Sequence, residues 1–247
     1  MSGHSKWHTI KHKKGAADAK RGKIFTRLIK ELTVAARAGG GDPDMNPRLR
    51  TIVLEAKANN MPRENIERAI RRGTGEEPGV SYEEIWYEGY GPGGVAILIF
   101  AMTDNANRTV AEIRHKLSRA GGNLGAANSV SWMFERKGQL YIDAEKYPED
   151  DALEAALDAG AEDFKAEDET YEITTDPATM HSVRSALEAK GYEIREAEIA
   201  SVPKNLVTVS GSTAESLVRL LEELEDLDDV QKVSANFDMD VEQMSSA

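Results

Sequence analysis

Apolar residues in the first third of the chain recur at steps of three and four, the spacing of one helix face. The first such stretch covers residues 16–38 and ends at a glycine triplet followed by Asp-Pro. The second, residues 46–60, starts with Asn-Pro, which is typical of a helix N-terminus. A third stretch at 62–73 starts with Pro and ends with Gly. The pattern therefore predicts a small bundle of three helices.

After a linker at 75–79 the pattern changes, because short apolar or alternating runs typical of strands now separate the helical stripes. Strands are predicted at 85–88, 95–102, 130–135, 139–143, 163–167, 171–175, 192–199, 206–209 and 230–237. Helices are predicted at 107–120, 149–159, 177–190 and 213–225. This mixture predicts the α+β class.

The order of these elements indicates how the domains are connected. Residues 139–199 read β-α-β-β-α-β, the ferredoxin-like order, and the flanks read β-α-β twice once this segment is removed. We therefore predict an N-terminal three-helix domain plus two ferredoxin-like α+β domains, one inserted in the other. The predicted domains are 1–75, 80–137 joined with 204–240, and the inserted 138–203. One sheet running continuously through both α+β units would contradict the insertion.

Charge is distributed very unevenly along the chain. Residues 1–75 hold 17 Lys and Arg against 7 Asp and Glu, whereas the other 172 residues hold 14 against 36. The overall charge of −12 would argue against a polyanionic partner. A partner responds to the local field and not to the average, so the N-terminal part is predicted to approach nucleic acid.

Several classes of protein are disfavoured by composition and motifs. The chain has no cysteine, which excludes disulfides and thiol chemistry. Its longest apolar run, Val95–Met102, is too short to cross a bilayer, and the N-terminus lacks the apolar segment of a secretory signal. The chain contains no G-x-S-x-G, H-E-x-x-H or P-loop motif. We expect a cytoplasmic protein with no membrane partner, catalytic residue, cofactor or metal.

Residues 4–14, His-Ser-Lys-Trp-His-Thr-Ile-Lys-His-Lys-Lys, form a basic segment around one tryptophan. Lysines neutralise phosphates and release counterions, and an indole offers a stacking face for an unpaired base. The alternative is a solvated tail whose Trp7 caps the helical bundle. The histidines spaced by four are not expected to bind metal, because lysines surround them and no carboxylate is near. The predicted nucleic-acid-binding residues are Lys6, Trp7, Lys11, Lys13, Lys14, Lys20, Arg21, Lys23, Arg71 and Arg72.

A second contact is predicted in the α+β part. Gly89–Gly94 satisfies G-x-G-x-x-G, but a strand follows it, so we interpret it as a hairpin connection and not a dinucleotide site. A polar cluster at 103–109 then leads into a helix that carries several basic residues. The alternative is ordinary helix capping and a solvated helix face. The predicted second contact consists of Tyr90, Gly91, Asn105, Asn107, Arg108 and Arg114.

Several stretches resemble the YebC family, also called the PmpR or probable transcriptional regulatory protein family. They are GHSKW at 3–7, DAKRGKIFT at 18–26, GGGDPDMNPRLR at 39–50, NNMPRENIERAI at 59–70, YEGYGPGG at 87–94, NRTVAEIRHKLS at 107–118 and GGNLG at 121–125. The resemblance implies a cytoplasmic, non-enzymatic protein of three domains. Family members are described as DNA-binding transcriptional regulators, and others, including mitochondrial relatives, act in translation. The motifs map onto Lys6, Trp7, Lys11, Lys20, Arg21 and Lys23.

Three classes of function remain open at this point. The first is a non-enzymatic, nucleic-acid-binding regulator of gene expression: a DNA-binding transcriptional regulator or, alternatively, a ribosome-associated translation factor that binds ribosomal RNA. The bundle lacks a convincing base-reading helix-turn-helix, which favours structured RNA. The second is an enzyme with a small-molecule pocket near Gly89–Gly94. The third is an adaptor that binds protein through the acidic ferredoxin-like unit. The sequence leaves open whether the protein is a monomer or a weak dimer.

Overall fold

The structure is a computed structural model that describes residues 19–167 and 169–239. The described chain divides into two compact units. One contains residues 19–129 and 212–233, and the other contains residues 130–211 and 234–239. Among the described residues, no helix has the length and apolarity that a bilayer crossing requires.

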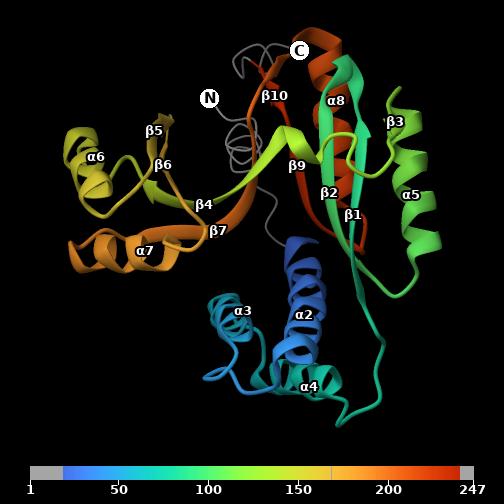
Figure 1. The fold of residues 1–247 in the computed structure, drawn as a ribbon, viewed down its shortest axis with the longest axis horizontal. Helices are drawn as coiled ribbons and strands as arrows, with labels where there is room; N and C mark the ends of the chain where they lie inside the picture. Colours follow the sequence, from blue (N-terminus) through green and yellow to red (C-terminus); the bar gives the residue numbers. More distant parts are fainter. Residues whose placement is uncertain (1–18, 168, 240–247) are drawn as a thin grey trace. The chain divides into compact units, whose positions relative to one another are not determined.

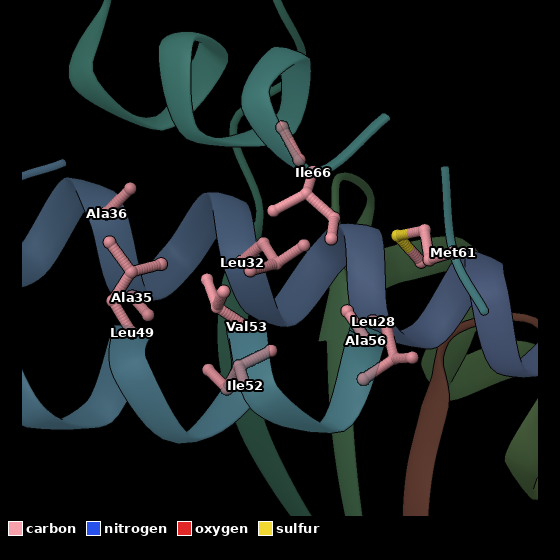
Figure 2. Close-up of a cluster of buried hydrophobic side chains, with 11 residues drawn as sticks. Leu28, Leu32, Ala35, Ala36, Leu49, Ile52, Val53, Ala56, Met61 and Ile66 are labelled. Atoms are coloured by element: carbon pink, nitrogen blue, oxygen red, sulfur yellow. The ribbon is translucent and has the colours of Figure 1, made fainter. Parts of the chain in front are cut away.

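The first unit begins with three helices, α2 (Ala19–Gly39), α3 (Pro47–Ala58) and α4 (Arg63–Thr74) (Figure 1). Their apolar stripes meet in one core, drawn in Figure 2. Leu28 and Leu32 from α2, Leu49 and Ile52 from α3 and Ile66 from α4 are all buried in it. The predicted three-helix bundle is confirmed, because the periodic apolar positions are the ones that become buried.

Asn46 joins the end of α2 to the start of α3. Its side-chain amide donates to the carbonyl oxygens of Ala35 and Gly40, both at 2.9 Å, and its Oδ1 accepts from the Leu49 amide at 3.1 Å. One buried side chain thus satisfies a carbonyl in the last turns of α2, the carbonyl of Gly40 just after that helix, and a free amide of α3. This explains why the Asn-Pro pair marks the beginning of α3.

The first unit also contains a four-stranded sheet of order β3-β1-β2-β9. The hairpin β1 (Glu83–Tyr90) and β2 (Ala96–Thr103) pairs from Glu83↔Thr103 to Tyr90↔Ala96. The other elements are η1 (Pro92–Gly94), α5 (Ala106–Arg119), β3 (Asn123–Leu124), α8 (Gly211–Glu225) and β9 (Val230–Ala235). An added Cβ would lie 3.0 Å from Leu117 of α5 at Gly89, and 3.2 Å from Leu217 of α8 at Gly91. Since residues two apart in a strand share a face, both helices cover one face of the sheet.

The second unit contains an antiparallel sheet of order β5-β6-β4-β7. Its elements follow the predicted β-α-β-β-α-β order. They are β4 (Phe134–Asp143), α6 (Glu149–Asp158), β5 (Asp163–Glu167), β6 (Thr170–Thr175), α7 (Met180–Ala189) and β7 (Ile194–Pro203). A short parallel pair, β8 (Val207–Thr208) with β10 (Phe237–Asp238), and the 3-10 turn η2 (Ser131–Met133) complete the unit.

The structure confirms the mixed α+β class and places the strands in separate sheets, but it corrects three local predictions. Residues 130–135 are not a strand of their own, because η2 occupies 131–133 and β4 begins at Phe134. β4 then continues through Gly138, where a break was expected. The segment 230–237 contains two strands that belong to different sheets. The domain boundaries given above stay a prediction.

Gly138 has a packing role. An added Cβ there would lie 2.4 Å from Thr175 Oγ1 and 2.8 Å from Met180 Cβ. Glycine is needed at this position because β6 and α7 approach the strand closely. The pairing of β4 with β7 continues without a shift on both sides of Gly138.

Candidate nucleic-acid interface

The predicted basic surface is only partly within the described chain. Lys6, Trp7, Lys11, Lys13 and Lys14 lie outside the described residues. Two further candidates, Lys20 and Arg21, lie in the first turn of α2, where only the backbone is described.

Lys23 follows one turn later, and its Nζ lies 2.8 Å from Asp226 Oδ1. That carboxylate is 80% exposed, so solvent weakens the pair. A phosphate could therefore replace Asp226 at little cost.

Many cations of the helical bundle are paired with carboxylates. Of the eleven Lys and Arg between residues 22 and 75, seven have a described carboxylate oxygen within 4.0 Å. They are Lys23, Arg27, Lys30, Arg48, Arg63, Arg68 and Arg71. Most of these pairs are exposed and individually weak, but they reduce the positive field. The count of basic residues therefore overstates the charge that this domain offers to a polyanion.

Four cations of the bundle have no carboxylate oxygen within 4.0 Å among the described residues: Arg37, Arg50, Lys57 and Arg72. Arg50 and Lys57 are exposed and seven residues apart on α3, so they share one face with the exposed Leu54 between them. Neither was among the predicted site residues. The sequence could have indicated them, because they are seven residues apart on α3 and lie outside its stripe of apolar residues.

Arg71 and Arg72 end α4, but their environments differ. Arg71 Nε donates to Glu77 Oε1 at 2.6 Å, and this hydrogen bond raises the pKa of the guanidinium. The stem of Arg72 packs on Gly79, which leaves the exposed Arg72 as the better candidate for a phosphate contact. Of the two predicted residues, Arg71 is already committed to an internal carboxylate.

A pocket of about 380 Å³ lies beside Arg72. It is lined by Ile29, Thr33, Arg72, Pro78, Gly79, Val80 and Tyr82. None of these residues belongs to Gly89–Gly94, the position expected for an enzyme pocket. The lining has no carboxylate or imidazole, the side chains that most often act in acid–base catalysis.

A buried ion pair connects α2 to the sheet. Lys30 Nζ lies 2.7 Å from Asp229 Oδ1, and both side chains are less than 10% exposed. The same ammonium donates to the carbonyl oxygens of Asp228 at 2.8 Å and Met102 at 3.3 Å, and lies 5.4 Å from the Tyr82 ring centroid. All three ammonium protons thus have acceptors, as a buried charge requires.

The other Asp229 oxygen binds the start of α5. Its Oδ2 accepts from Arg108 and Thr109, both at 2.7 Å, and from Thr103 at 3.0 Å. Burial alone raises the pKa of Asp229, but hydrogen bonds from Lys30, Arg108 and Thr109 outweigh it and hold the pKa well below its usual range. Asp229 is therefore an anion that fixes three elements together.

Arg108 was predicted to contact nucleic acid, but the structure gives its guanidinium a different role. It donates to Asp229 and to Asp104, both at 2.7 Å, and these hydrogen bonds raise its pKa. Asn105 likewise caps α5, because its Oδ1 accepts from the Arg108 amide at 3.1 Å. Both residues position the helix, which is the alternative that the sequence left open.

The residues of the predicted second contact do not form one cluster. Tyr90 and Gly91 lie at one end of the β1–β2 hairpin, whereas Asn105 and Asn107 follow its opposite end at Thr103. Seven strand steps separate the ends, about 23 Å at 3.3 Å per residue. Tyr90 also donates its hydroxyl to the Ser129 carbonyl at 3.1 Å. One small ligand could not contact both groups, although a long polymer could.

The glycines around this hairpin serve packing. Gly91 is buried, and its added Cβ would lie 2.9 Å from Ile97 Cδ1. Gly122 is tighter still, because its added Cβ would lie 2.2 Å from the Tyr90 carbonyl oxygen. Close packing therefore explains the glycine at position 91, which is part of the G-x-G-x-x-G match. Because Gly91 is buried, its backbone is not exposed to a binding partner.

Gly122→Ala is expected to lower the free energy of unfolding by about 1–3 kcal/mol, because backbone must move to admit the methyl group. Chemical unfolding followed by circular dichroism measures the change. Gly22→Ala is the matched control, since no atom lies within 4 Å of its added Cβ and alanine suits a helix, so its stability should rise slightly. Equal free energies of unfolding for the two variants would show that the close contact at Gly122 does not exclude a larger residue.

Outside the bundle, the exposed surface of α5 carries arginines that a polyanion could contact. Arg114 and Arg119 are exposed, and so is Asn107 about two turns before Arg114. Lys116 instead pairs with Glu223 of α8 at 3.0 Å. Among the residues of the predicted second contact, Asn107 and Arg114 thus have exposed side chains on α5.

Trp86 and Phe100 form an aromatic pair that the sequence reasoning missed. They are register partners in β1 and β2 with ring centroids 4.7 Å apart, and Trp86 is 49% exposed. Strand alternation places Trp86 on the face opposite Gly89 and Gly91, away from α5 and α8. The neighbours of Trp86 in the sequence, Ile85 and Tyr87, gave no signal of this pair, because Phe100 is fourteen residues away.

No group of three or more His, Cys, Asp or Glu side chains suited to a metal ion occurs among residues 19–167 and 169–239. His4, His8 and His12 lie outside these ranges.

Comparison with known proteins supplies the family. Residues 5–76 match the TACO1/YebC protein N-terminal domain, and residues 82–237 match the TACO1/YebC second and third domain. The crystal structure of a conserved hypothetical protein, Aq1575 from Aquifex aeolicus, has a TM-score of 0.84 at 48% identity. It covers 91% of this chain and 93% of its own.

Relatives of the same length are also similar. The probable transcriptional regulatory protein GSU1074 of Geobacter sulfurreducens is 58% identical over 99% of this chain and 98% of its own. The probable transcriptional regulatory protein of Gemmatimonas aurantiaca is 57% identical over 100% of both. Because these matches extend over nearly every residue, this chain belongs to the TACO1/YebC family.

Proposed function

We propose that this protein is a cytoplasmic, non-enzymatic regulator of transcription that binds nucleic acid. The observation that carries the proposal is the full-length similarity, at 54–58% identity, to proteins named probable transcriptional regulatory protein. The excess of ten positive charges in residues 1–75 supports it, because phosphate contacts supply most non-specific affinity for nucleic acid.

The proposed contact residues combine the sequence candidates with those that the described chain favours. The lysines of residues 6–14 and the first turn of α2 supply the main electrostatic contact. Arg72, Arg50 and Lys57 extend it over the bundle, since no described carboxylate within 4.0 Å competes for them. Arg114 on α5 supplies a second contact. The carboxylates of the remaining chain repel phosphate and restrict the orientation of binding.

Binding of structured RNA or the ribosome is the second candidate, and the Trp86–Phe100 pair favours it. A half-exposed indole suits stacking with an unpaired base, which RNA loops offer more often than duplex DNA. Trp86→Ala should then weaken binding to an RNA with single-stranded loops and leave duplex DNA binding unchanged.

The α3 face gives the sharpest test within the described chain. Arg50→Ala with Lys57→Ala should weaken nucleic-acid binding and reduce the log–log salt slope by about 1.4–1.8, at roughly 0.7–0.9 per phosphate contact. Fluorescence anisotropy with a labelled 20-base-pair duplex and a stem-loop RNA across a salt series measures both quantities. The stronger response identifies the preferred nucleic acid.

Arg63→Ala with Arg68→Ala is the matched control, because it removes the same charge from cations that already pair with Glu67 and Glu64. Its effect should be smaller. If both double variants lose affinity equally, pairing does not decide which cations bind. If neither changes affinity or slope, the bundle takes no part in binding.

A further inference from the structure

The pocket of about 380 Å³ in the first unit is formed by two helices and the segment that follows them. Ile29 and Thr33 line it from α2 and Arg72 lines it from α4, while residues 78–82, which lead from α4 to β1, supply the rest of the lining. The two helices touch at this point, because a Cβ added at Gly73 would lie 2.4 Å from the Thr33 carbonyl oxygen. All of these residues belong to the same compact unit, so the pocket is a feature of that unit.

The connecting segment 78–82 is held against the helices at two points. Arg37 of α2 donates from Nη1 to Ser81 Oγ at 2.6 Å and to the Tyr82 carbonyl oxygen at 3.4 Å. A Cβ added at Gly79 would lie 3.0 Å from Arg72 Cγ, so the backbone packs on the stem of that arginine. Because these contacts fix the wall of the pocket, a ligand would not need to order it on binding.

The lining combines apolar surface with one aromatic ring and one cation. Ile29, Pro78 and Val80 supply the apolar surface, and Val80 is 47% exposed. Tyr82 supplies the ring, and Arg72 supplies the guanidinium. Such a lining suits a flat, mostly apolar ligand with a negative charge at its edge. A nucleotide has this combination, since its base stacks on aromatic rings and its phosphate pairs with arginine.

Two unpaired cations lie beside the pocket. Among residues 19–167 and 169–239, no carboxylate oxygen lies within 4.0 Å of Arg37 or Arg72. Arg37 follows Thr33 by one turn of α2, and a Cβ added at Gly73 would lie 3.2 Å from the Arg37 backbone nitrogen. The two arginines therefore start from adjacent turns of two contacting helices. A nucleotide within a strand has a phosphate on each side, so two cations fit a strand better than a free nucleotide.

We propose that this pocket receives one unpaired base of a nucleic-acid strand, while Arg37 and Arg72 contact the phosphates on either side of it. The base stacks on the ring of Tyr82, on the face away from Lys30, whose Nζ lies over the ring at 5.4 Å from its centroid. Binding of this kind rests on the proposed function and adds the class of nucleotide that the protein recognises.

The pocket is expected to discriminate poorly between the four bases. Thr33 Oγ1 donates to the Ile29 carbonyl oxygen at 2.8 Å, so the hydroxyl proton is already used. The apolar side chains of the lining offer no hydrogen bond to a base edge. Recognition therefore depends on stacking and on phosphate charge, which are common to every nucleotide.

A single unpaired base isolates the contribution of the pocket. Fluorescence anisotropy would compare a labelled 20-base-pair RNA duplex with the same duplex carrying one bulged adenosine. The natural protein should bind the bulged duplex about 5-fold or more tightly, the lower end of what stacking of one base contributes. Tyr82→Leu keeps apolar volume but removes the ring and should abolish this preference, whereas Tyr82→Phe should retain it.

Val80→Trp tests the same pocket without removing a contact, because the larger side chain fills the space for the base. It should also abolish the preference for the bulged duplex. Leu157→Trp is the matched control, since Leu157 is 55% exposed on α6 in the other compact unit, and it should leave the preference unchanged. Circular dichroism and thermal unfolding would verify that all four variants are folded.

Photocrosslinking locates the base directly. With 4-thiouridine as the bulged nucleotide, we expect crosslinks to the segment 78–82, and crosslinks chiefly to Trp86 or elsewhere would overturn the proposal. Millimolar adenosine monophosphate should not displace the bulged duplex, and displacement would show that the pocket takes a free nucleotide instead. If the protein binds both duplexes but Tyr82→Leu and Val80→Trp keep the natural preference, the pocket does not hold the base and the proposed function stands. If the protein binds no nucleic acid, both are overturned.

Discussion

Replacing Asp229 by alanine is expected to lower the free energy of unfolding by about 3–5 kcal/mol, one of the largest effects of any single substitution in this chain. The substitution leaves Lys30, 6% exposed, without its carboxylate, and removes the shared acceptor of Arg108, Thr103 and Thr109. Urea unfolding monitored by circular dichroism measures the loss. α2 should also lose protection from hydrogen exchange where it joins the sheet.

Two comparisons separate this effect from a general loss of charge. Arg63→Ala breaks an exposed pair with Glu67 and should cost less than about 1 kcal/mol. Lys30→Met combined with Asp229→Leu removes both buried charges and should recover part of the stability. A loss below about 1 kcal/mol for Asp229→Ala would show that the pair does not hold α2 to the sheet.

The pKa of Asp229 fixes the sign of a pH dependence. Because the folded pKa lies below the unfolded value of about 3.9, the carboxylate stabilises the folded state fully above that value. The contribution is lost as pH falls through the lower folded pKa. The stability difference between the natural protein and Asp229→Ala should therefore be constant near neutral pH and shrink in strong acid.

Removing four lysines from the N-terminal segment should cause the largest change in binding. Lys6→Ala, Lys11→Ala, Lys13→Ala and Lys14→Ala together are expected to weaken nucleic-acid binding at 0.15 M salt by roughly 10²–10³-fold, the electrostatic worth of four phosphate contacts. Equilibrium titration of a labelled duplex measures the dissociation constant. Thermal unfolding of the same variant should be close to that of the natural protein.

The control removes four cations from the other compact unit, all of which pair with carboxylates: Lys137, Lys146, Arg184 and Lys190. The net charge changes equally, so any general effect of charge is matched. Comparable losses of affinity in the two variants would mean that overall charge, and not the N-terminal segment, determines binding.

The sequence predicts most elements of this fold because periodicity is a local property. Strand β5 has the expected bounds, and the Asn46-Pro47 pair alone predicted where α3 begins. Gly138 was misread because its reason is Thr175 and Met180, which lie 37 and 42 residues further along the chain. A glycine required by close packing has the same local signature as one that ends a strand.

The candidate site was less predictable, because charge counts do not reveal pairing. Arg108 looked available in the sequence, yet its partner Asp229 is 121 residues away. Arg50 and Lys57 looked ordinary, yet they are exposed without a described carboxylate beside them. Segments that are rich in Lys and Arg can be recognised from sequence, whereas the cations that remain available to a partner depend on tertiary contacts.

The salt dependence of nucleic-acid affinity reports directly whether the N-terminal lysines contact phosphate. The dissociation constant of the full-length protein and of the quadruple N-terminal lysine variant would be measured between 50 and 200 mM salt. We expect the slope of log affinity against log salt to be about 3 units shallower for the variant, because four counterion-releasing contacts are gone. Identical slopes would contradict it, since the cations of the N-terminal segment would then make no contact with phosphate.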